Sequence, residues 1–164
     1  MKTEVKQVAA ALNEASVRYV IAGGLAVIVH GYMRMTMDVD LVIDLEQGNL
    51  LRALDALEKI GYIPRLPVTK EQFADADTRE SWINDKHMLV FPLWNPAREN
   101  SMVIDVFVKS PFDFDAEYKK AVWVHLDEGL ATPFVARDSL IRMKQEAGRP
   151  KDLDDIEHLK KDVE

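Results

Sequence analysis

The amino-acid sequence predicts an α/β (α+β) fold: a mixed, mostly antiparallel sheet with packed helices and a small C-terminal helical part. Three observations predict it. Residues 20–43 alternate apolar runs with a pair of glycines and a short polar crossing, the pattern of strand, tight turn, buried helix and strand. Two apolar runs, 87–93 and 102–108, flank a segment rich in turn residues and predict an antiparallel strand pair. From residue 136 onward, apolar residues recur at helical spacing.

The composition suits one folded domain. We divide the 164 residues into an α/β core, 1–135, and a C-terminal helical segment of the same domain, 136–164. Apolar residues make up 48% and charged residues 30%, enough for a core and a soluble surface, and the absence of cysteine excludes disulfides and thiolate metal sites. A net charge of −7 argues against a general nucleic-acid binder. It leaves room for a nucleotide held through metal ions, or for a local basic patch that docks one RNA end.

Localisation is expected to be cytoplasmic. The first residues lack the long apolar segment of a signal peptide, and no apolar run approaches the length that a bilayer requires, so we expect no membrane contact.

The first third of the chain predicts helices and strands that alternate. The segment after the glycine pair is apolar nearly all round, which is typical of a buried helix. The expected elements are a helix over 3–15 with Thr3 as its N-cap, a strand over 17–22, a helix over 23–32, a strand over 38–44, a turn at 46–49 and a helix over 50–60.

The remainder is less regular, because two prolines interrupt residues 64–85. The expected elements are a short helix within 69–78, the strand pair 87–93 and 102–108, an irregular connection over 111–118, a strand over 121–126, a strand or loop over 130–135, and two helices, 136–147 and 151–161, separated by a break at 148–150.

Two aspartates lie inside the apolar run of the second strand. Side chains of a strand alternate between its faces, so Asp38 and Asp40 should share one face. Two adjacent carboxylates repel each other, and a divalent cation is the usual reason for such a pair, because Mg²⁺ prefers carboxylate oxygens. The alternative is a strand end with two solvated acids.

The glycine pair and the aspartate pair together resemble the signature of a known family. Gly23-Gly24, thirteen intervening residues and then Asp38-Val39-Asp40-Leu41 are similar to the signature of the nucleotidyltransferase superfamily, which has the DNA polymerase beta-like fold. The lead-in Arg34-x-Thr36-x-Asp38 resembles small AbiEii-type proteins, the toxins of type IV toxin–antitoxin systems. The likeness covers residues 17–44, 101–108 and 132–160, whereas residues 62–100 gain nothing from it and are where we expect substrate specificity.

The resemblance implies an enzyme that moves a nucleoside monophosphate from an NTP to a hydroxyl group, with Mg²⁺ or Mn²⁺ as cofactor. The acceptor would be tRNA or another RNA, or a protein, and a cognate antitoxin would be a further partner. Two alternatives remain open: a nucleotidyltransferase that modifies a small molecule such as an antibiotic, and a non-catalytic nucleotide-binding or interaction module.

The resemblance also implies site residues outside the aspartate pair. Asp105 lies in an otherwise apolar strand, where a carboxylate is costly to bury unless it is paired, and it would be the third metal ligand; alternatively it pairs with a buried arginine. Gly23 and Gly24 either form a tight turn that needs positive φ, or they leave the backbone at a helix N-terminus free of side chains so that phosphate can approach it. Family members often carry serine at the second position, so that hydroxyl contact is absent here.

The C-terminal segment contributes further candidates. Residues 138–152 resemble a motif of AbiEii-like proteins in which a helical lysine, here Lys144, faces the triphosphate, with Arg149 and Asp152 nearby. The alternative is an ordinary solvated helix face. Arg34 and Thr36 either contact phosphate or, as we favour, brace the acidic strand.

Other polar and aromatic residues are expected to be structural. Asp44 keeps the parity of the acidic pair but lies at a turn, and His30 is expected to pack at a helix end. The tryptophans are expected to belong to the core or a lid: Trp82, Trp94 and Trp123.

Overall fold

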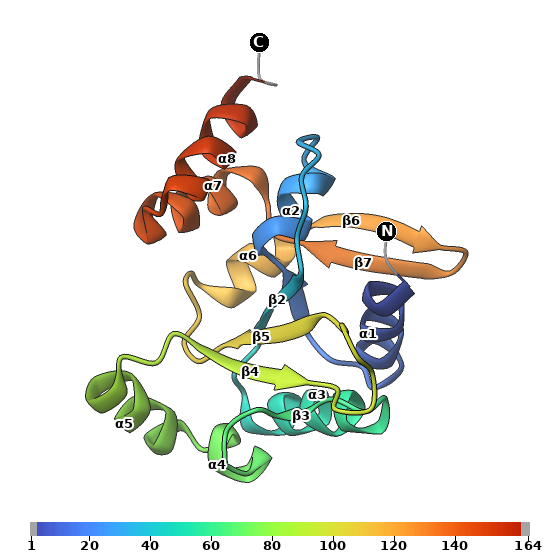
Figure 1. Ribbon diagram of the computed structural model, residues 1–164, viewed down its shortest axis with the longest axis vertical. Coiled ribbons are helices and arrows are strands. Elements are labelled where there is room, and N and C mark those ends of the chain that lie inside the picture. Colours follow the sequence, from blue (N-terminus) through green and yellow to red (C-terminus); the bar gives the residue numbers. More distant parts are fainter. Residues whose placement is uncertain (1–2, 162–164) are drawn as a thin grey trace.

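The computed structural model describes residues 3–161 (Figure 1). The strands are β1 (Tyr19–Ile21), β2 (Asp38–Ile43), β3 (Ile63–Pro64), β4 (Val90–Trp94), β5 (Val103–Phe107), β6 (Val122–Asp127) and β7 (Leu130–Phe134). The helices are α1 (Thr3–Glu14), α2 (Gly23–Val29), α3 (Gln47–Lys59), α4 (Lys70–Ala74), α5 (Ala76–Lys86), α6 (Phe114–Lys120), α7 (Arg137–Ala147) and α8 (Pro150–Lys161).

The strands form one sheet in the order β3-β4-β5-β2-β1-β7-β6. Four neighbouring pairs are antiparallel, and the pairs β2·β5 and β1·β7 are parallel. This mixed, mostly antiparallel sheet with its C-terminal helix pair confirms the predicted fold class. Because β2 lies between β1 and β5 at the centre of the sheet, its two aspartates have strands on both sides.

The core lies between the sheet and the helices packed on it. Helix α1 packs against α3, α2 packs on β2, and α7 pairs with α8 at the end of the molecule opposite α4 and α5 (Figure 1). The apolar spacing of residues 3–15 produces the buried face of α1 as expected. Thr3 is the first residue of this helix rather than its N-cap, so that expectation is wrong.

The turn expected at 46–49 is also wrong, because a helix already begins there. The carboxylate of Glu46 accepts hydrogen bonds from the backbone N–H groups of Gly48 at 3.0 Å and Asn49 at 2.7 Å. These bonds satisfy free donors of the first turn, so α3 starts at Gln47.

Residues 62–100 are more helical than the sequence indicates. The single short helix expected within 69–78 is replaced by α4 and α5, which meet at Asp75. Thr69 and Gln72 form a capping box for α4, and the Asp75 carboxylate caps α5 through the N–H of Thr78.

Two expectations near the C-terminal half need correction. Asp113 accepts a hydrogen bond from the N–H of Ala116 and starts α6 where an irregular connection was expected. Pro150 is the first residue of α8 rather than part of the break, a position where its missing N–H costs nothing. Residues 130–134 form strand β7. No helix within residues 3–161 has the length and apolar character to cross a membrane.

Candidate active site

Three aspartates lie on one face of the central sheet. Strands β2 and β5 are parallel neighbours in which Asp40 and Asp105 are Cα partners. Asp38 precedes Asp40 by two residues, so alternation places all three carboxylates on the same face. Their neighbours Val39 and Ile104 are fully buried on the opposite face. Tertiary pairing therefore assembles an acidic cluster from residues 65 positions apart in the sequence.

Burial and the neighbouring carboxylates disfavour the ionised forms of Asp40 and Asp105. Burial raises the pKa of Asp40 to about 6, with Asp105 and then Asp38 adding to the rise, while Lys144 and Arg149 oppose it. Burial, and then the charge of Asp38, raises the pKa of Asp105. The cluster is therefore a place where an added cation would be stabilised.

Gly23 touches the acidic cluster directly. It has φ +60°, and a Cβ atom there would lie 1.8 Å from Oδ2 of Asp40. Only glycine allows both the left-handed backbone and this approach. Gly24 is needed for a different reason: a Cβ there would lie 2.6 Å from Oγ1 of Thr36. The positive φ expected of the turn thus applies to Gly23, whereas Gly24 makes room for the segment that leads into β2.

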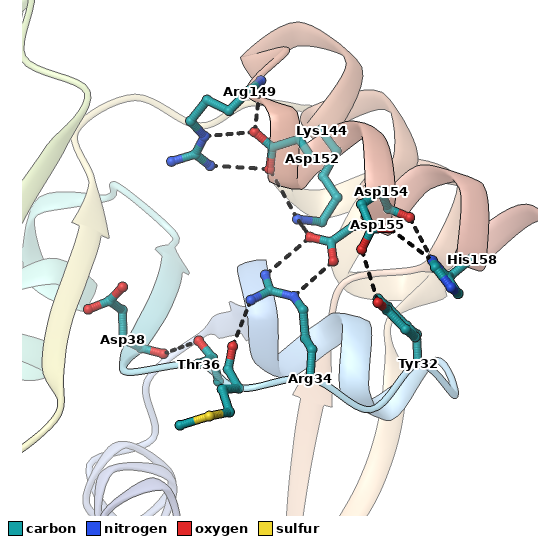
Figure 2. A network of polar contacts seen from close by, with 11 residues as sticks. Tyr32, Arg34, Thr36, Asp38, Lys144, Arg149, Asp152, Asp154, Asp155 and His158 are labelled. Carbon is teal, nitrogen blue, oxygen red and sulfur yellow. Dashed lines mark hydrogen bonds and ion pairs between the residues drawn. The ribbon is translucent and has the colours of Figure 1, made fainter.

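A polar network connects this lead-in segment to the C-terminal helices (Figure 2). Arg34 Nε lies 2.8 Å from Oδ1 of Asp155, and its Nη2 donates to Oδ2 of Asp155 at 3.1 Å. The Nζ atom of Lys144 lies 2.6 Å from the same carboxylate. Asp155 is 1% exposed, so one buried carboxylate holds two cations from distant parts of the chain. Arg34 thus connects the segment that leads into β2 with α8, and its bracing of the acidic strand stays a prediction.

Asp152 forms the second part of the network. It is fully buried, lies 3.3 Å from Lys144 and accepts from Nε of Arg149 at 2.7 Å. Lys144 is 5% exposed, so it is an ion-paired buried lysine and not the solvated helix residue that was the alternative. The side chain of Arg149 remains 60% exposed. Three cations share two carboxylates here, which leaves this wall with a net positive charge.

These residues surround one cleft of about 610 Å³, within the size range of small-molecule sites. The cleft is lined by α2, the 34–37 segment, β2, β4, β5, α7 and α8. All ten residues selected from the sequence line it: Gly23, Gly24, Arg34, Thr36, Asp38, Asp40, Asp105, Lys144, Arg149 and Asp152.

The donor set of the acidic cluster fits a divalent cation that is shared with a substrate. Within residues 3–161, no group of three or more His, Cys, Asp or Glu side chains is arranged to hold a metal ion by itself. Mg²⁺ in nucleotide enzymes is usually held by one or two carboxylates together with phosphate oxygens and water, so a complete protein cage is not required. The side chains of Asp38, Asp40 and Asp105 make no hydrogen bond or ion pair with other described residues, which leaves their oxygens available as ligands.

Most of the residues expected to be structural make contacts within the fold and do not line the cleft. His30 is buried and its Nε2 lies 2.8 Å from the carbonyl oxygen of Val135. Asp44 forms an ion pair with Arg18 at 2.5 Å. Trp82 is buried and stacks with Phe91, so it belongs to the core. Trp94 and Trp123 are 41% and 48% exposed, so they are not core residues, and their assignment to a lid stays a prediction.

Asp155 and the apolar residues that line the cleft were not expected from the sequence. Asp155 follows Asp152 by three residues, so the two share a helix face, and this spacing could have indicated a second partner for Lys144. Leu89 and Val90 come from residues 62–100, which gained nothing from the family likeness, and Phe107 follows Asp105 by two residues.

The fold and this site define a nucleotidyltransferase-like protein. The structure matches the crystal structure of ANT(2")-Ia in complex with adenylyl-2"-tobramycin, with TM-score 0.61, 13% identity, and coverage of 99% of this chain and 88% of that chain. It also matches an antigenic nucleotidyltransferase-like protein from Paracoccidioides brasiliensis, with TM-score 0.53, 20% identity, and coverage of 96% and 73%. No curated protein matches the chain. Residues 2–161 match the model of the family described as "Nucleotidyltransferase of unknown function (DUF6036)", and the chain belongs to that family.

Proposed function

We propose that this protein transfers a nucleoside monophosphate from an NTP to a hydroxyl group in a metal-dependent reaction. The observation that carries the proposal is the register of β2 and β5, which sets Asp105 beside Asp40 and on the same face as Asp38. Three carboxylates that make no side-chain hydrogen bond or ion pair at a cleft are costly for a fold. Asp40 and Asp105 also carry raised pKa values, and perturbed acids of this kind cluster at functional sites.

Each wall of the cleft has a role in this reaction. Asp38, Asp40 and Asp105 would hold Mg²⁺ or Mn²⁺, which, when bound, neutralises developing phosphate charge and lowers the pKa of the attacking hydroxyl. The glycine pair lines the cleft beside Asp40, where a phosphate would meet the start of α2. Lys144 and Arg149 provide positive charge on the facing wall, in a partly desolvated cleft where charge acts more strongly than in water.

The transfer itself exchanges one phosphorus–oxygen bond for another. The acceptor oxygen attacks the α-phosphorus, the bond from that phosphorus to the bridging oxygen of the β-phosphate breaks, and pyrophosphate leaves. The proton of the hydroxyl passes to Asp105. Beyond this the chain mainly positions the reactants and stabilises charge.

For the acceptor, we propose the hydroxyl of an RNA such as tRNA or of a protein, with a cognate antitoxin as partner. This proposal rests on the likeness of the lead-in and C-terminal motifs to AbiEii-type toxins. A cationic small molecule is the second candidate. The net charge of −7 and the fold shared with a structure that contains adenylylated tobramycin favour it. A non-catalytic module is disfavoured by the three unpaired carboxylates.

The test is incubation of the protein with each labelled NTP, Mg²⁺ and either total RNA, a cell protein extract or an aminoglycoside. We expect label to move to one acceptor class and to be lost in Asp40→Asn. Asp44→Asn is the matched control, because Asp44 directly follows β2, does not line the cleft and pairs with Arg18. Absence of transfer to every acceptor, together with absence of NTP binding, would contradict the proposed function.

A further inference from the structure

A second hollow opens on the same face of the sheet as the acidic cluster. Its volume is about 460 Å³, and its lining includes Arg65, Trp94 and Val103. Val103 precedes Asp105 by two residues on β5 and is the Cα partner of Asp38. Alternation therefore places Val103 on the face of the three carboxylates, about 7 Å along the strand from Asp105. The second hollow is thus the neighbour of the cleft, and β5 runs from one to the other.

Strand β4 continues this face beyond β5. Phe91 is fully buried and stacks on Phe73 of α4, with ring centroids 4.1 Å apart, so it takes the face that the helices cover. Alternation places Pro92 and Trp94 on the opposite face. Pro92 is the Cα partner of Asp105, and the Trp94 side chain is 41% exposed. An indole ring open to solvent therefore lies on the face that carries the acidic cluster.

Arg65 adds a cation at the edge of this face. Its backbone N–H donates to the carbonyl oxygen of Pro92 at 2.9 Å, which continues the pairing of β3 with β4 by one residue. Because Pro92 is the partner of Asp105, Arg65 lies two strand spacings, about 10 Å, from Asp105. The positive charge of Arg65 opposes the rise in the pKa of Asp105. Its exposed guanidinium makes no hydrogen bond or ion pair with any residue of the described range 3–161.

The charge of the second hollow differs from that of the whole chain. Its described lining carries two arginines and one glutamate, Arg65, Arg98 and Glu99, whereas the chain has a net charge of −7. Nη1 of Arg98 donates to Oε1 of Gln7 at 2.8 Å, so Arg65 is the arginine of this lining that has no such partner. An unpaired cation attracts a phosphate and repels a cationic small molecule. A neutral protein side chain would gain nothing from it.

We propose that the second hollow binds the end of a single-stranded RNA, with a base stacked on Trp94 and a phosphate held by Arg65. The proposal rests on the proposed function, because it sets the terminal ribose hydroxyl beside Asp105, where the attacking hydroxyl loses its proton. An aromatic ring next to a cation is how proteins hold single strands, since the ring stacks on a base while the cation meets the backbone. Both residues lie within 62–100, where the sequence predicts substrate specificity.

The experiment measures binding of a fluorescently labelled single-stranded RNA of about eight nucleotides to the full chain, by fluorescence anisotropy and without NTP. Trp94→Ala should weaken binding by roughly 5- to 150-fold, the loss expected for one stacked base. Arg65→Ala should weaken it as well and should lower the slope of log Kd against log salt concentration by about 0.7, because one phosphate contact is lost. Trp94→Phe keeps a ring and should retain most of the affinity.

Two variants are matched controls. Trp123→Ala removes a tryptophan that is 48% exposed from β6, at the opposite edge of the sheet, and Arg52→Ala removes an exposed arginine from α3. Neither should change the Kd for RNA. Circular dichroism checks that each variant is folded. If Trp94→Ala does not fold, Arg65→Glu, at an exposed position, carries the test and should abolish RNA binding.

The outcomes separate this inference from the proposed function. RNA binding that survives Trp94→Ala and Arg65→Glu, or tighter binding of DNA of the same sequence, would overturn the inference. Transfer of label to a protein or an aminoglycoside, without RNA binding, would overturn it too. Calorimetric titration with NTP and Mg²⁺ is done in parallel: binding of NTP without binding of RNA removes this inference alone, whereas absence of NTP binding removes the proposed function and this inference with it.

Discussion

The carboxylate of Asp40 lies directly against the backbone of Gly23, so closely that a Cβ atom on Gly23 would stand 1.8 Å from Oδ2. This contact joins the turn before α2 to the acidic face of β2. It makes the glycine a part of the site and not only of the turn.

The first prediction is that Gly23→Ala lowers the stability by more than backbone strain alone and also disrupts the site. Gly129→Ala is the matched control, because Gly129 also has positive φ, +72°, but a Cβ there meets nothing within 4 Å. The control should cost about 1 to 2 kcal/mol of unfolding free energy from φ alone. Gly23→Ala should cost more and should abolish NTP binding. Urea denaturation and calorimetry measure both, and equal stability losses with unchanged NTP binding would contradict the contact.

The second prediction concerns pH. Burial raises the folded pKa of Asp40 from 3.8 to about 6, so between these values the folded state binds more protons than the unfolded state. Stability therefore falls as pH rises from about 4 to 6, by at most about 3 kcal/mol for this group. Asp40→Asn removes the penalty, and we expect the apo variant to be more stable than the wild type by about 1 to 3 kcal/mol at pH 7.5.

This difference should shrink below pH 4, where the wild-type carboxyl is protonated in both states. Urea denaturation at pH 4 and pH 7.5 measures it. A variant that is destabilised at pH 7.5 would mean that Asp40 holds the fold together and would weaken the case for a metal site.

The third prediction is that metal and nucleotide bind together. The triphosphate and the acidic cluster are both negative, so NTP alone should bind weakly. Mg²⁺ with NTP at a hundredfold excess over Kd should raise the Tm by roughly 5 to 10 °C. Asp38→Asn should reduce this shift without removing the fold. A Tm shift by NTP that is the same with EDTA as with Mg²⁺ would argue against metal-mediated binding.

The fourth prediction separates Lys144 from a surface lysine. Lys144→Ala leaves Asp152 and Asp155 without one of their partners, although each keeps an arginine, so we expect a loss of about 2 to 3 kcal/mol in stability. NTP use should fall by roughly ten- to a thousandfold. Lys160→Ala removes the same charge from an exposed helix position and should change neither quantity.

The comparison requires that Lys144→Ala be assayed at a temperature where it is folded, checked by circular dichroism. Adding Asp155→Asn to Lys144→Ala should lower the stability further, because it removes the charge that pairs with Arg34, and it should not recover NTP use. Equal NTP use by the two lysine variants would restrict the site to the aspartate core.

The local features of this protein could be predicted from its sequence because each depends on neighbouring residues. Alternation along β2 places Asp38 and Asp40 on one face, and the apolar positions of residues 3–15 produce the buried face of α1. Helix starts were less predictable, since a side chain such as Glu46 can cap a helix without a distinctive pattern. Thus α6 and the division of residues 69–86 into two helices were not anticipated.

The site itself needed the tertiary structure. Nothing in the sequence states that β5 pairs in parallel with β2 at the register that puts Asp105 beside Asp40, or that Asp155 binds both Arg34 and Lys144. Periodicity reports which face a side chain takes, whereas the partner it meets is decided by packing between segments that lie far apart in the chain. The sequence thus determined which residues are candidates for the chemistry, and only the folded sheet and the paired C-terminal helices decided that they surround one cleft.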